Sequence, residues 1–177
     1  MTLIVGTNSY LSLADAEAYF AARLRATAWA SASDADKETA LLQACRAIES
    51  LVPNWEGAPT VTGQALQWPR MEVPNRRTGG RTSGWPYDGY AYYDMTAMPQ
   101  PLTDAQCEEA LELLARAQDL DMDDAERDRA RGVVKTSIAK ASVEYGNVTV
   151  YGGVLVSAQA WQCLRPLRRT TPAQVRM

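Results

Sequence analysis

Apolar positions recur at helical spacing in several stretches of the chain, each preceded by a polar residue that can cap a helix. The first stretch predicts a helix over residues 13–26, capped by Ser12 and carrying Leu24 on its apolar face. The second predicts a helix from Ser33 to about Leu51. Both place acids in the first turn, where carboxylates oppose the positive end of the helix dipole. The first fifty residues are therefore expected to be largely helical.

The clearest helical pattern begins at Thr103, which matches a capping box with Gln106, and is expected to end near Gln118. Its apolar stripe contains Cys107, Ala110, Leu111, Leu114 and Ala117. A last short helix is expected after a Ser157 cap, with Pro166 closing it. Amphipathic helices of this kind bury their apolar faces against one another, so the pattern predicts a small helical bundle.

The segment from residue 53 to 102 has no helical period and is rich in Pro, Gly and Tyr. A connection of this length is far above the usual handful of residues, which favours a functional role. Pro69 keeps the preceding Trp68 extended, so that this tryptophan can lie across the bundle. Residues 71–100 are expected to form a protruding loop. The expected structural anchors are Trp29, Trp55, Trp68 and Pro69.

Residues 143–145 and 148–151 alternate in polarity and flank Gly146-Asn147, which predicts a β-hairpin. The expected fold class is therefore mainly α: a small helical bundle with a β-hairpin or extended excursion and a long irregular loop. We expect one domain over residues 1–167, followed by a flexible tail over 168–177.

The composition excludes several classes of catalytic and metal site. The apolar fraction of 46% and the charged fraction of 22% are those of an ordinary globular protein. Histidine is absent, which removes Ser-His and Cys-His catalysis and most metal sites. Asp119, Asp121 and Asp123 match the start of a calcium loop, but Asp124 and Ala130 stand where its glycine and bidentate glutamate belong. We expect no enzyme, no metal and no cofactor.

The sequence has no apolar run of membrane-spanning length and no signal peptide, so we expect no membrane partner and synthesis in the cytoplasm. Its charge is polarised: residues 104–128 hold ten acids and two arginines, whereas residues 157–177 hold four arginines and no acid. This polarity favours assembly with a neighbour, although a solvated helix face and a loose basic tail would also produce it. The candidate inter-subunit acidic patch is Glu108, Glu112, Asp121, Asp123 and Asp124.

The loop combines cations with aromatic residues, which is the pattern that single-stranded nucleic acid requires for phosphate contact and base stacking. It is equally typical of an adaptable protein-contact surface. The chain as a whole is acidic, with a pI near 5.1, so protein contact is the favoured interpretation. The candidate loop contacts are Arg76, Arg77, Arg81, Trp85, Tyr87 and Tyr90.

Three segments, in this order, resemble the small tailed-phage virion proteins that are often labelled DnaT-like single-strand-binding proteins and that look like head-tail adaptors. They are Ser12-Leu13-Ala14-Asp15-Ala16-Glu17-Ala18-Tyr19, Gln64-Ala65-Leu66-Gln67-Trp68-Pro69-Arg70 and Ala141-Ser142-Val143-Glu144-Tyr145. The second is the most specific. The resemblance covers roughly residues 9–70 and 102–167, and the loop at 71–100 is longer than the family pattern leads us to expect.

The resemblance implies a structural protein of the virion neck, made in the host cytoplasm and copied into a dodecameric ring. Its partners would be the phage portal protein, a tail or head-tail stopper protein, and itself, with nucleic acid only as the passing genome. A C-terminal segment would dock on the portal. The candidate portal-docking residues are Trp161, Leu164, Arg165, Arg168 and Arg169. The alternative function is binding of single-stranded DNA.

Overall fold

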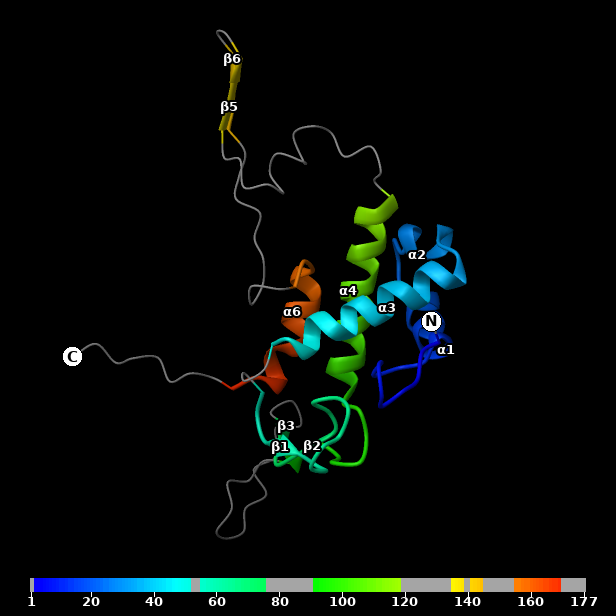
Figure 1. Ribbon diagram of the computed structural model, residues 1–177, viewed down its shortest axis with the longest axis vertical. Helices are drawn as coiled ribbons and strands as arrows, with labels where there is room; N and C mark the ends of the chain where they lie inside the picture. Colours follow the sequence, from blue (N-terminus) through cyan, green and yellow to red (C-terminus); the bar gives the residue numbers. More distant parts are fainter. Residues whose placement is uncertain are drawn as a thin grey trace, which may run out of the picture.

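The computed structural model describes residues 2–51, 55–75, 91–118, 135–138, 141–144 and 155–169. The fold is mainly α with short two-stranded antiparallel sheets, which confirms the predicted fold class. The central element is helix α4 (Gln100–Gln118), and helices α3 (Asp34–Glu49) and α6 (Ala158–Leu164) pack against it. In Figure 1, helix α1 (Leu13–Ala21) lies to the right of α4 and α6 lies to its left.

The first helix is shorter than predicted. Ser12 caps α1 in a reciprocal capping box with Asp15, as expected from the sequence, but the helix ends at Ala21. A separate helix, α2 (Thr27–Ser31), follows. Arg25 has a φ of 61°, which a right-handed helix does not allow, and Leu24 is 90% exposed. The predicted helix over 13–26 with Leu24 on its apolar face is therefore wrong.

The physical cause of this break is a contact between aromatic rings. Phe20 stacks on Trp29 with 4.3 Å between ring centroids, and both side chains are buried. The chain must turn after α1 to return Trp29 to this position. Burial of two large rings outweighs the few helical hydrogen bonds that a continuous helix would add.

The remaining helix boundaries divide into two groups. Ser33 and Ser157 cap α3 and α6, which confirms both predictions, and a 3₁₀ turn, η1 (Arg165–Leu167), follows α6. Helix α4 instead begins at Gln100, so Thr103 lies within its first turn and donates its hydroxyl to the carbonyl of Gln100 at 2.9 Å. The predicted capping box at Thr103 is wrong, because the helix already starts directly after Pro99.

Short antiparallel ribbons complete the fold. Strand β1 (Ala58–Pro59) pairs with β2 (Arg70–Met71), and β3 (Pro74–Asn75) pairs with β4 (Ala91–Tyr92). These four strands lie at the end of the molecule where α4 begins (Figure 1). The β3–β4 ribbon therefore forms the base of the predicted loop, whose residues 76–90 lie outside the described part of the chain.

The structure describes a β-hairpin that precedes the predicted one along the chain, and the predicted partner strand 148–151 lies outside the described residues, so that pairing stays a prediction. Strand β5 (Lys135–Ile138) pairs with β6 (Ala141–Glu144), with Thr136 opposite Val143. Val143 was expected to begin the first strand of a hairpin with residues 148–151, but its described partner precedes it. The β-branched Thr136 and Ile138 provide the strand propensity for this earlier partner. Residues 145–154 lie outside the described part.

The core consists of two clusters along α4. Around the β1–β4 end, Trp55 and Trp68 meet edge to face with ring centroids 5.7 Å apart. The second cluster surrounds Phe20 and Trp29. The predicted anchors Trp29, Trp55 and Trp68 are thus 1–2% exposed and belong to the core, and the Trp68–Pro69 peptide bond is cis. Both clusters contain side chains of α4, which explains the central position of this helix.

Candidate functional site

The segment Gln64–Arg70 is held in place by a network of hydrogen bonds, which we call the Arg70 network. Arg70 is 7% exposed, and its guanidinium donates from Nε to the carbonyl of Glu56 and from Nη2 to that of Gly57, both at 2.8 Å. Its Nη1 also donates to the carbonyl of Gln67 at 3.2 Å. The Gln64 amide donates to two further carbonyls of the same run. This cation is therefore used to hold loops together rather than to contact a ligand.

Gly57 must be glycine for this arrangement. Its φ is +65°, and a Cβ there would lie 2.0 Å from the carbonyl oxygen of Met71. The absence of a side chain lets the two backbone segments approach where Arg70 bridges them.

Glu49 connects the N-terminal segment to the Arg70 network. Its carboxylate accepts hydrogen bonds from the Tyr10 hydroxyl and, at 2.9 and 3.1 Å, from the backbone N–H of Gln67. Burial and the neighbouring Glu49 carboxylate raise the pKa of Tyr10 well above its ordinary value, so its hydroxyl remains a donor. Glu49 thereby joins the N-terminal segment and the Gln64–Arg70 segment to α3.

Gln106 is the buried polar centre of the bundle. It is fully buried, and its Nε2 donates to the Ser9 hydroxyl at 2.8 Å and to the carbonyl of Leu41 at 2.9 Å. Its Oε1 accepts from the backbone N–H of Tyr10 at 3.0 Å. One side chain of α4 thereby binds α3 and the N-terminal segment.

The structure describes two residues of the predicted acidic patch, Glu108 and Glu112. Glu108 is 3% exposed; its carboxylate forms an ion pair with Arg23 and accepts a hydrogen bond from Tyr19. Its assignment to a solvated acidic surface is therefore wrong, because charged and polar groups of the same chain cover it. Glu112 is partly exposed and pairs with Arg116 at 3.4 Å. Asp121, Asp123 and Asp124 lie outside the described residues.

Glu109 is a buried acid whose structural role the sequence pattern did not reveal. It is 1% exposed and accepts the backbone N–H groups of Val156 and Ser157 at 3.0 and 2.9 Å. Burial raises its pKa, against the lowering effect of these two hydrogen bonds. The carboxyl group attaches the beginning of α6 to α4.

The predicted portal-docking residues separate into core and surface. Leu164 is fully buried, so its inclusion in a docking surface is wrong. Arg168 stacks on Trp161, with its Cζ 3.7 Å from the ring centroid, and forms an isolated β-bridge with Trp55. Arg165, the first residue of η1, and Arg169 are exposed. These two arginines and the Trp161–Arg168 pair form the C-terminal basic surface.

A cleft of about 360 Å³ lies between α1 and the first half of α4. The buried residues Tyr10, Leu11 and Cys107 form its floor, and Ala18, Tyr19, Met98, Asp15, Gln100, Thr103 and Asp104 form its walls and rim. Two of these residues are acidic and none is basic. Hydrogen bonds from Ser12 lower the pKa of Asp15, which keeps its carboxylate charged.

An exposed apolar patch lies at the β1–β4 end. Val61 is 61% exposed, and Tyr92 and Met95 are each 54% exposed. The Thr60 hydroxyl donates to the carbonyl of Met95 at 3.0 Å, which joins the two loops that carry them. The candidate loop contacts Arg76, Arg77, Arg81, Trp85, Tyr87 and Tyr90 lie outside the described residues.

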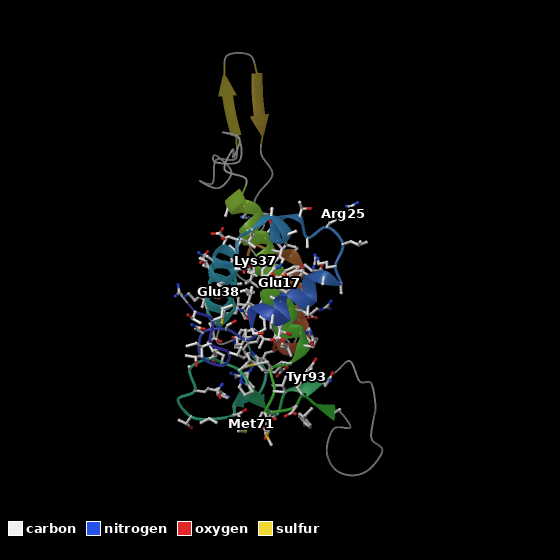
Figure 2. The ribbon with its side chains drawn as sticks, turned by 90° about the vertical axis from the view of Figure 1, so that its right-hand side faces the viewer. Glu17, Arg25, Lys37, Glu38, Met71 and Tyr93 are labelled. Carbon is white, nitrogen blue, oxygen red and sulfur yellow. The ribbon has the colours of Figure 1, made fainter. Side chains whose placement is uncertain are left out.

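Most cations in the described bundle already have partners within the chain. Lys37 donates to Glu17 at 2.7 Å and lies 5.5 Å from the Trp29 ring centroid, and Figure 2 shows Lys37 and Glu17 side by side. In the ranges that the structure describes, no cluster of three potential metal ligands is found. No helix there is both long enough and apolar enough to cross a bilayer.

Comparison with known proteins gives one match. A family model described as "Putative DnaT-like ssDNA binding protein" matches residues 1–177. No curated protein matches the chain. No solved structure matches it either.

Proposed function

We propose, from the premise that this chain belongs to the DnaT-like family, that it is a head-tail adaptor: a structural virion protein whose copies form a ring between the phage portal and the tail or stopper. It would act in the virion neck after synthesis in the host cytoplasm, without catalysis or a cofactor. The observation that carries this proposal is the burial of Trp29, Trp55 and Trp68 in the core, together with the use of Arg23, Lys37 and Arg70 for contacts within the chain.

A single-strand groove needs exposed aromatic faces beside unpaired cations. Trp29, Trp55 and Trp68 are buried, and Arg168 stacks on the ring of the half-buried Trp161. Arg70 is bound to carbonyls, and Lys37 is bound to Glu17. The described body is therefore better suited to assembly through its surface than to tracking a phosphate backbone.

The arrangement of surfaces around α4 also supports a ring. A ring requires two different patches on each subunit, because a head-to-tail contact joins unlike surfaces. The acid-rimmed cleft is lined by α1 and α4, whereas the C-terminal basic surface is carried by α6, η1 and the residues that follow. Opposite charges on different elements favour closure in one orientation.

The direct test mixes the purified full chain with portal rings of the phage that carries it and images the product. We expect a ring of adaptor copies on the portal. Arg169→Glu, on the C-terminal basic surface, should weaken the association, whereas Arg46→Glu, at an exposed position of α3, should leave it unchanged. A folded chain that does not associate with the portal would overturn the proposal.

The description of the family favours one alternative, binding of single-stranded DNA, for which the candidate residues are those of the loop. Titrating an oligodeoxythymidine with the chain at several salt concentrations separates the two functions. If three arginines each neutralise one phosphate, the logarithm of the binding constant falls with the logarithm of salt with a slope of about −2. The adaptor proposal expects no binding even at low salt.

A further inference from the structure

The lining of the cleft between α1 and α4 suits an arginine side chain that has apolar residues on either side of it. Its floor is apolar and aromatic, and its rim carries Asp15 and Asp104 without a basic residue among the lining side chains. The aliphatic stem of an arginine can lie on an apolar floor while its guanidinium contacts a carboxylate at the rim. About 360 Å³ is enough for a few side chains but small for a folded element.

The rim groups are available for such a contact. Asp104 accepts only a local hydrogen bond in the described structure, from the Gln100 amide at 2.7 Å, and both residues are on the rim. Asp15 remains anionic through its hydrogen bonds with Ser12. By contrast, Glu108 on the same helix is buried and already paired with Arg23. The cleft is thus the place where α4 presents an accessible acid beside an apolar cavity.

We propose that this cleft receives residues 170–177 of a second copy of the chain, with Arg176 directed to Asp15 and Asp104. The segment carries one arginine between two apolar residues, Val175 and Met177, and no acidic side chain. Its composition therefore matches both the floor and the rim of the cleft.

The segment and the cleft belong to different elements of the subunit. Residues 170–177 follow Arg169 and η1, which comes directly after α6, whereas the cleft is lined by α1 and α4. Eight extended residues span at most about 26–29 Å, enough to leave their own subunit. A tail of one subunit that occupies the cleft of the next makes a head-to-tail contact, and the disulfide formed in a chain with both cysteines distinguishes this contact from one within a single chain. Its role in closing a ring rests on the proposed function, but the contact between two copies does not.

Disulfide trapping between two full-length variants tests the contact without the portal. One variant carries Gln100→Cys at the rim of the cleft, and the other carries Val175→Cys in the tail, which leaves Arg176 in place. Their mixture should form a disulfide-linked heterodimer in low salt under mild oxidation. The matched control is Gln43→Cys, at an exposed position of α3 that does not line the cleft, and the parent chain gives the background from its native cysteines.

The contribution of the rim carboxylates is tested by adding a second substitution to the Gln100→Cys chain. Adding Asp104→Asn should lower the yield of heterodimer about threefold, since one charge pair is lost. Adding Glu38→Gln, which neutralises a half-buried acid of α3, should leave the yield unchanged. High salt should lower the yield of the parent pair.

Three outcomes would overturn the contact: a yield at Gln100→Cys no greater than at Gln43→Cys, a yield insensitive to Asp104→Asn, or, in a chain with both cysteines, disulfides formed only within one molecule. Trapping without portal association would overturn the proposed adaptor function and retain the contact. Portal association without trapping would overturn the contact alone.

Discussion

At the scale of the residue, buried polar side chains decide how the helices of this protein fit together. Gln106 occupies a position whose spacing from Thr103 suggests a local capping role. In the structure its partners are Ser9, Tyr10 and Leu41, which are remote in sequence. The pattern around Gln106 contains no sign of these partners, and for this reason the sequence interpretation assigned it to the wrong interaction.

Replacement of Gln106 by leucine should lower the free energy of unfolding by about 2–4 kcal/mol. The substitution leaves the Tyr10 N–H and the Leu41 carbonyl without their partner in a buried site. Urea denaturation measures the loss. Gln43→Leu, at an exposed position of α3, is the matched control and should change stability by less than about 0.5 kcal/mol. Equal effects of the two substitutions would contradict the role of the buried amide.

The three cysteines should differ sharply in reactivity. Burial raises the pKa of Cys45 and of Cys107 to about 12, whereas Cys163 is half-buried. Because the thiolate is the reactive form, we expect a thiol reagent at pH 8 to modify Cys163 first and the other two only after unfolding. Spectroscopic thiol titration of the native and denatured chain checks this order. A Cys163→Ser chain should show no fast-reacting thiol in its native state.

The same pKa shifts make stability depend on alkaline pH. The folded chain holds the thiol protons of Cys45 and Cys107 up to about pH 12, while an unfolded thiol releases its proton near the ordinary value of 9.0. Between these values unfolding releases protons, so the free energy of unfolding should fall as the pH rises. A flat profile from about pH 9 upward would show that these thiols titrate normally in the folded chain.

At the scale of the element, local signals and distant contacts determine different helix ends. Ser33 and Ser157 cap their helices through hydrogen bonds to residues three positions later, so the sequence was sufficient to place them. The end of α1 depends instead on the stacking of Phe20 against Trp29. An alanine-rich sequence favours continuing the helix, and only the tertiary contact reveals the break.

Glu109 is expected to be the main polar support of α6. Glu109→Ala removes the acceptor for the N–H groups of Val156 and Ser157 and should lower the free energy of unfolding by about 2–4 kcal/mol. Glu112→Ala, one turn away and partly exposed, loses only a surface ion pair and should cost less than about 1 kcal/mol. Thermal and urea unfolding compare the two variants. Similar losses would assign no special role to Glu109.

The pH dependence of the Glu109 contribution has a definite sign. Burial raises its folded pKa above the ordinary value of 4.5, so the folded chain retains a proton that the unfolded chain releases. As the pH rises through this window, unfolding becomes easier. Relative to Glu109→Gln, the parent chain should therefore lose stability as the pH rises from 4.5 toward neutrality.

At the scale of the whole molecule, the fold class was predictable but the surfaces were not. Helical periodicity placed the bundle, and the tryptophans Trp55 and Trp68 were expected as anchors before their burial was known. The acidic patch was inferred from sequence proximity alone, whereas folding buries Glu108 and leaves Asp104 at a cleft. That cleft is built from α1, the N-terminal segment and α4, so no continuous pattern could indicate it.

The segment over residues 76–90 should be dispensable for folding. Asn75 and Ala91 are paired across the β3–β4 ribbon, so an Asn-Gly link can replace the segment with a two-residue hairpin turn. We expect the free energy of unfolding to change by less than about 1 kcal/mol, because the core clusters are untouched. Urea denaturation measures it, and a Gly/Ser segment of equal length serves as control. Loss of oligonucleotide binding only in such chains would place the alternative function in this segment.

The Arg70 network affects what a shared sequence run says about two related proteins. The residue run that most readily identifies the chain encodes carbonyl contacts to Glu56, Gly57 and Gln67, all inside the molecule. A search based on that run will gather proteins that share a scaffold, whatever each of them touches. Two proteins that share this run therefore share a fold, but they need not bind the same partner, because partners contact other surfaces.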